Sequence, residues 1–117
     1  MQPIPKVTRN DVERVVRRDF APNDVGEALR VLSEYQEGGS EREVYRVQLA
    51  VLKLAAGSMD ELRHHIESAK GDYRDVLAWA EYPLYFQSSF TGDEESAAEE
   101  QRVIDADWKQ YREWLDR

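Results

Sequence analysis

The sequence predicts an all-α protein, a compact single-domain bundle of about six helices that spans residues 1–117. Apolar residues recur at helical spacing along most of the chain. Capping residues precede several of these segments, and glycine or proline follows them. The predicted connections are short, which favours antiparallel packing of neighbouring helices over an extended repeat array.

The first two predicted helices lie on either side of Pro22. An N-terminal tail, residues 1–10, ends at Asn10, which has the capping-box spacing to Glu13 and opens a helix over 11–20. Asn23 is the predicted cap of a second helix, which ends at the glycine pair 38–39.

The third predicted helix, residues 41–56, differs from the others because apolar side chains surround almost its whole circumference. Ser40 and Glu43 form its predicted capping box, and Arg46 and Lys53 share the one remaining strip. A helix that is apolar on nearly every side is a buried one. We therefore expect 41–56 at the centre of the fold.

Two further helices are predicted at 59–70 and 72–82, followed by a loop at 87–94 and a last helix from about 95 to 116. Ser58 and Glu61 give another capping box, and Gly71 separates the two helices. Pro83 ends the second of them, because a proline disfavours the helical conformation of the residue before it. On the last helix, a narrow apolar arc is expected, formed by Ile104, Trp108, Tyr111 and Leu115.

The segment RDVLAWAEYPLYF, residues 74–86, is the most aromatic part of the chain. A helical wheel places one apolar face towards the core, formed by Tyr73, Val76, Leu77, Ala80 and Leu84. Trp79 and Tyr82 lie on a second face, with Ala78 beside Tyr82. Coverage of this second face by the last helix is the favoured alternative, because bulky aromatic residues are more often core than site.

If the second face is uncovered, it is a candidate interaction surface. Its predicted members are Trp79, Tyr82, Tyr85 and Phe86, with Glu81 on the rim. Exposed aromatic anchors with a charged rim are the usual composition of a protein-binding patch. A homodimer that buries the same rings is a further alternative.

The charge of the chain limits the partners that it can attract. The formal net charge is −8, and the segment GDEESAAEE at 92–100 is strongly acidic. Such a protein is repelled by nucleic acids and by anionic membranes, so we expect neither of them as a partner. The expected partner is a basic protein. Arg9, Arg14, Arg17 and Arg18 form the one contrary basic patch. The absence of cysteine and of any long apolar run predicts a cytoplasmic protein.

No catalytic, metal or cofactor site is predicted. Glu61 and His64 have the Glu-x-x-His spacing of carboxylate-bridged metal sites, but the spacing occurs once and such sites require it twice. We expect a solvated His64 and a half-buried, hydrogen-bonded His65. No serine lies in a nucleophile elbow and no glycine-rich phosphate loop is present.

The segments VQLAVLKLAAG and GDYRDVLAWAEYP, within residues 43–83, resemble small bacterial proteins that are known only as uncharacterised. The resemblance implies a bacterial helical protein and transfers no functional residue. Together with the residues, it favours a non-catalytic protein-interaction or regulatory module. Two alternatives are left open: a small-molecule or metal-dependent activity in a pocket between helices, using His65, and an acidic inhibitor of a basic protein, of the immunity type.

Overall fold

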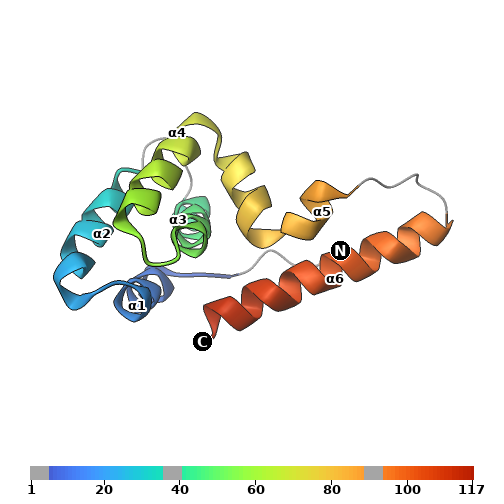
Figure 1. Ribbon diagram of the computed structural model, residues 1–117, viewed down its shortest axis with the longest axis horizontal. Coiled ribbons are helices and arrows are strands. Elements are labelled where there is room, and N and C mark those ends of the chain that lie inside the picture. The colour runs from blue at the N-terminus through green and yellow to red at the C-terminus, as the bar shows by residue number, and fades with distance from the viewer. Residues whose placement is uncertain (1–5, 36–40, 89–93) are drawn as a thin grey trace.

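The computed structural model describes residues 6–35, 41–88 and 94–117, and it confirms the all-α bundle (Figure 1). No strand occurs in these ranges. The α-helices are α1 (Arg9–Asp19), α2 (Val25–Ser33), α3 (Glu41–Ala55), α4 (Met59–Glu81), α5 (Pro83–Gln87) and α6 (Glu94–Leu115), and a short 3-10 helix, η1 (Pro22–Asp24), precedes α2. None of the helices described is long and apolar enough to cross a membrane.

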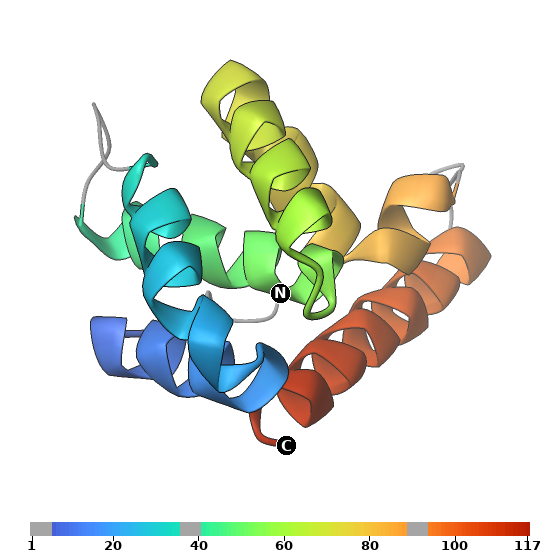
Figure 2. The same ribbon diagram turned by 60° about the vertical axis from the view of Figure 1, so that its left-hand side comes forward.

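Helix α3 is central, as the sequence predicts. Its residues from Val47 to Leu52 are all buried, and Arg46 and Lys53 are the partly exposed cations of its remaining strip. Figures 1 and 2 show α1, α2 and α4 packed around it. The core is completed from the other helices, chiefly by Val15, Val16, Phe20, Leu32, Leu62, Ile66 and Tyr111.

The helix starts differ from the prediction in places. Helix α1 begins two residues earlier than expected, within the predicted tail, because Thr8 is its N-cap and the Thr8 backbone N–H donates to the Asp11 carboxylate at 2.9 Å. The cap of α4 is confirmed, since Glu61 N–H donates to Ser58 Oγ. The predicted cap at Ser40 and Glu43 and the stop at 38–39 lie outside the described residues and side chains.

The predicted break at Gly71 is a kink within α4. Asp72 leaves helical geometry, with φ −154° and ψ 100°. Its carboxylate accepts the Arg74 backbone N–H at 3.0 Å, as an N-cap residue does, and so starts the second half of the helix. The kink turns the second half towards α5 and α6 (Figure 1).

Helix α6 has two unlike halves. In the inner half, residues 107–115, Asp107, Tyr111 and Trp114 are buried. In the outer half, residues 94–106, no residue is buried, and this half extends with α5 away from the other helices. The molecule is correspondingly elongated, with extents of 51 × 29 × 24 Å. Of the predicted apolar arc, Tyr111 is thus buried, whereas Ile104, Trp108 and Leu115 are only partly buried.

Candidate functional site

The candidate site is the aromatic surface, which we define as Trp79, Tyr82, Leu84, Tyr85 and Phe86. Trp79 is 39% exposed, Leu84 49% and Phe86 52%. These are the exposed large hydrophobic residues of the described chain, and they fall within eight consecutive positions. The favoured expectation, that the last helix covers Trp79, is therefore wrong for this side chain. Tyr82 and Tyr85 are partly exposed, and their rings meet edge to face at 6.3 Å.

A change of helix produces the outward position of Leu84. Tyr82, with φ −139° and ψ 59°, ends α4, and Pro83 opens α5 as its first residue. Proline suits that position because its missing N–H would have no helical partner there. The wheel that placed Leu84 in the core assumed one continuous helix, so its prediction is wrong. Ala78, expected on the outer face, is buried. The predicted loop at 87–94 is also shorter, since Gln87 ends α5 and Glu94 begins α6.

Asp107 of α6 holds the start of α5. Its two carboxylate oxygens accept the backbone N–H groups of Leu84 and Tyr85, each at 3.0 Å. Asp107 is fully buried, so these two bonds replace the water that its charge has lost. A carboxylate at a helix N-terminus also interacts favourably with the helix dipole. Asp107 therefore fixes the orientation in which α5 presents Leu84 and Phe86.

Glu81, predicted on the rim of the surface, is fully buried, and the prediction is wrong. Its carboxylate forms a two-point pair with the Arg46 guanidinium, with distances of 2.9 Å to Nε and 2.6 Å to Nη2. The Glu81 carboxylate raises the pKa of Arg46, mainly through these hydrogen bonds. This pair anchors the end of α4 to the central helix, directly below the aromatic surface.

The hydroxyl of Tyr111 lies buried near this pair and has no hydrogen-bond partner among the described residues. Burial raises the pKa of Tyr111, and the nearby Glu81 carboxylate raises it further. Gln110, next to it in α6, donates weakly from Nε2 to the backbone carbonyl groups of Ala80 and Glu81, at 3.3 and 3.5 Å. The inner half of α6 is thus joined to α4 by both apolar and polar contacts.

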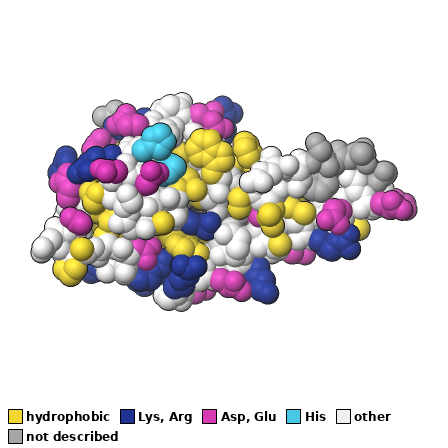
Figure 3. All heavy atoms as spheres, in the orientation of Figure 1, with side chains coloured by type: hydrophobic (Ala, Val, Ile, Leu, Met, Phe, Trp, Pro, Cys, Tyr) yellow, Lys and Arg dark blue, Asp and Glu magenta, His cyan; other side chains and the backbone are white. Residues whose placement is uncertain are grey.

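Acidic groups border the aromatic surface on the side of the outer half of α6. Tyr85 Oη donates to Glu100 at 2.9 Å, and this bond raises the pKa of Tyr85. Glu94, Glu95 and Glu99 lie further out on the same helix, where Glu99 pairs with Arg102. Figure 3 shows hydrophobic side chains over α5 and the adjoining part of α6, with acidic side chains beyond them towards the start of α6.

Two of the four arginines in the basic patch of α1, Arg14 and Arg18, have a structural role. Arg14 Nη1 donates to the Leu115 carbonyl at 2.8 Å, and Arg18 Nη1 donates to the Trp114 carbonyl at 2.8 Å. The Arg18 guanidinium also lies over the Trp114 ring, 5.3 Å from its centroid. These cations satisfy the last carbonyl groups of α6, where the helix dipole favours positive charge.

The histidines occupy the predicted environments. His64 is exposed, and His65 is partly buried with its Nε2 3.3 Å from Glu61. Burial lowers the pKa of His65, and the charge of His64 lowers it further. Within 6–35, 41–88 and 94–117, no three His, Asp or Glu residues form a group that could hold a metal ion.

Comparison with known proteins found no matching family model, no matching curated protein and no matching solved structure. The site is therefore defined by its own geometry. Sequence reasoning placed Trp79, Tyr82, Tyr85 and Phe86 in one surface. The structure adds Leu84, which is exposed, and Glu100, which bonds to Tyr85. Pro83 is the signal from which the exposure of Leu84 could have been predicted. A proline starts a new helix there, so the helical wheel of the preceding helix no longer applies to Leu84.

Proposed function

We propose that this protein is a non-catalytic interaction module that binds a basic protein segment on the aromatic surface. The observation that carries the proposal is the concentration of exposed large hydrophobic side chains at Trp79, Leu84 and Phe86. Such side chains gathered on a monomer's surface are typical of protein-binding sites. We place the protein in the bacterial cytoplasm, on the resemblance of residues 43–83 and the absence of cysteine.

Charge complementarity favours a basic partner. In the outer half of α6, Glu100 bonds to Tyr85 of the surface, and Glu94, Glu95 and Glu99 lie further out. The one basic residue of this half, Arg102, is paired with Glu99. An amphipathic helix with lysine or arginine along its apolar edge would place leucine-like side chains against Leu84 and Phe86 and its cations against these glutamates.

The positioning of the surface also supports binding. Glu81 and Asp107 lie beneath it and are fully buried, with charged or backbone partners on both carboxylate oxygens. These bonds hold the end of α4 and the start of α5 before any partner arrives. A surface held in this way loses little conformational entropy on binding.

The proposal is tested with a synthetic amphipathic helix of leucine and lysine, titrated into isotopically labelled protein and followed by backbone amide NMR shifts. We expect shifts at residues 79–86 and in the outer half of α6, and a loss of affinity of about tenfold in Phe86→Ser, since exposed anchor residues carry much of the binding energy. Glu95→Gln should weaken binding and increase its tolerance to salt. Glu13→Gln on α1, a matched loss of one charge, should leave binding unchanged.

Two outcomes would overturn the proposal. Shifts that map elsewhere, or an affinity that Phe86→Ser leaves unchanged, would remove the aromatic surface as the binding site. Sedimentation of the purified protein provides the second criterion. A dimer that Phe86→Ser converts to a monomer would show that a second copy of this chain, and not a basic partner, occupies the surface.

A further inference from the structure

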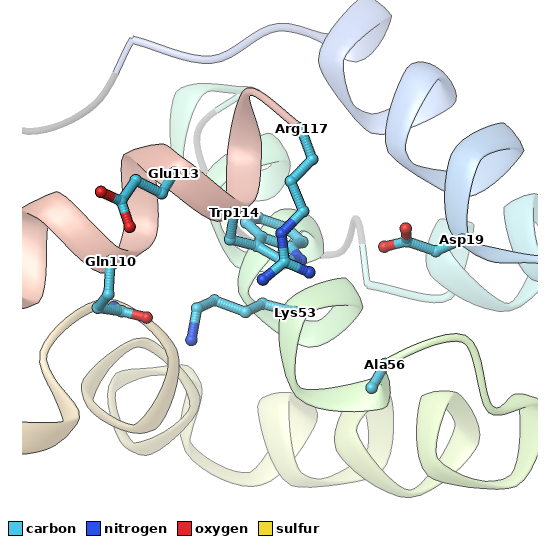
Figure 4. Close-up of a pocket in the computed structure, with 7 residues that line it drawn as sticks. All are labelled: Asp19, Lys53, Ala56, Gln110, Glu113, Trp114 and Arg117. Carbon is cyan, nitrogen blue, oxygen red and sulfur yellow. The ribbon is translucent and has the colours of Figure 1, made fainter.

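A separate cavity lies between the ends of α1, α3 and α6, and it shares no residue with the aromatic surface. Its volume is about 440 Å³, and it is lined by Asp19, Lys53, Ala56, Gln110, Glu113, Trp114 and Arg117. This is within the usual range of small-molecule sites, roughly 300–1,000 Å³. Figure 4 shows the side chains of Lys53 and Arg117 directed into the space between the helices.

The two cations of the cavity are Lys53 and Arg117. No hydrogen bond or ion pair to another described residue involves the Lys53 ammonium or the Arg117 guanidinium. Burial lowers the pKa of Lys53, and the positive charge of Arg117 lowers it further, whereas the negative charge of Asp107 raises it. Lys53 is partly buried and Arg117 is exposed, so the Lys53 ammonium is the less hydrated of the two cations and gains more from a bound anion.

Neither of the two carboxylates that line the cavity, Asp19 and Glu113, forms an ion pair with Lys53 or Arg117 in the described chain. Asp19 is engaged by Arg18, whose Nε and Nη2 donate to its two oxygens at 2.8 and 3.1 Å. Figure 4 shows the Glu113 carboxylate turned away from the space between Lys53 and Arg117. On a protein of net charge −8, a cavity lined by two cations that form no ion pair with a described residue is a local exception.

The rest of the lining suits an organic ligand. Trp114 gives the cavity a buried aromatic wall, which the Arg18 guanidinium holds from one side. Gln110 uses its amide N–H groups on the Ala80 and Glu81 carbonyls, so its amide oxygen is available to accept a hydrogen bond from a ligand hydroxyl or amine.

We propose that this cavity is a binding site for a small organic oxyanion, a carboxylate or a phosphate ester. The Arg117 guanidinium provides a planar fork for two oxygens, and the Lys53 ammonium provides a point charge beside it. Trp114 contacts the apolar part of the ligand, and Gln110 receives a hydroxyl or amine. The proposal rests on Lys53 and its surroundings, and it is independent of the protein partner.

The test uses inorganic phosphate and succinate as probes, each titrated against sodium chloride at matched ionic strength. The readout is the NMR shift of the Trp114 indole N–H, assigned with Trp114→Phe. We expect a saturable shift, and the probe that saturates at the lower concentration identifies the oxyanion class. Lys53→Met should fold, since it removes an unpaired, half-buried charge, and should lower affinity by about tenfold or more, the usual contribution of one charge-assisted contact.

Matched variants separate a site from general charge attraction. Lys109→Met removes an exposed lysine of α6 outside the cavity and should leave the affinity unchanged. Arg117→Gln should weaken binding, whereas Arg112→Gln on the exposed side of α6 should not. The absence of a saturable shift with both anions, or equal affinities in Lys53→Met and Lys109→Met, would overturn the proposal.

Discussion

The two halves of α6 belong to one continuous helix but occupy different environments. The inner half buries Asp107, Tyr111 and Trp114 and is joined to α1, α4 and α5 by hydrogen bonds. The outer half buries no residue and carries four glutamates in its first seven positions. Burial therefore divides this continuous helix into a part that supports the fold and a part whose side chains stay exposed.

The largest expected loss of stability comes from the ion pair between Arg46 and Glu81, which lies near Tyr111 of the inner half. Glu81→Ala leaves the largely buried Arg46 guanidinium, whose side chain is 19% exposed, without its partner, and we expect the free energy of unfolding to fall by about 3–5 kcal/mol. Urea unfolding monitored by circular dichroism measures it, with Glu67→Ala on the exposed face of α4 as the control. A double variant, Arg46→Met with Glu81→Met, should recover most of the loss. A loss below about 1 kcal/mol in Glu81→Ala would contradict this account.

A smaller loss is expected where the inner half holds α5. Asp107→Ala removes the acceptor of the Leu84 and Tyr85 N–H groups, and we expect a loss of about 2–3 kcal/mol. Hydrogen exchange adds a local readout, because these two amides should lose protection before the rest of the chain. Asp105→Ala, an exposed aspartate of the outer half, should change neither quantity. Unchanged protection at Leu84 in Asp107→Ala would show that α5 does not depend on this cap.

A gain is expected from the one defect of the inner half. Tyr111→Phe removes a buried hydroxyl that bonds to no residue in the described part of the chain, and we expect the free energy of unfolding to rise by about 1 kcal/mol. The rise in the midpoint of urea unfolding, with an unchanged slope, is the measurement. A loss of stability would show that the hydroxyl makes a bond to water or to the Arg46–Glu81 pair.

The smallest effect is expected in the outer half. Glu99→Gln breaks the exposed pair with Arg102, and the free energy of unfolding should change by less than about 0.5 kcal/mol. The same variant should weaken binding of the leucine–lysine helix, because it removes one acidic group beside the aromatic surface. A change of more than about 1 kcal/mol in Glu99→Gln would contradict the conclusion that the outer half contributes little to stability.

Features set by neighbouring residues were predictable from the sequence. The cap at Ser58, the break at Gly71 and the burial of α3 depend on residue type and helical spacing within a few positions. The environments of His64 and His65 follow from the same wheel. Four of the five residues of the aromatic surface were identified in this way, since they are close in the chain.

Features set by distant pairs were not predictable. Glu81 was placed on the surface because a charged residue is rarely buried, and its partner Arg46 lies 35 positions away. Asp107 is likewise separated from Leu84 by 23 positions. Helix α5 was missed because its five residues are too few to show a period. The sequence placed Lys53 on the polar strip of the third helix. It did not predict the cavity around Lys53, because α1 and α6, which are distant in the chain, contribute most of the lining.

Because Asp107 caps α5 from a later part of the chain, α5 can fold only after Asp107 has been synthesised. A five-residue helix is far below the length at which a helix persists alone in water, roughly 12–15 residues. Residues 83–87 emerge from the ribosome well before Asp107, so they remain without their structure while the intervening chain is made. A chain interrupted before residue 107 carries Leu84 and Phe86 but does not hold them in place. The aromatic surface is thus among the last parts of the described fold to form, because it needs a residue that is synthesised 20 positions after α5 ends.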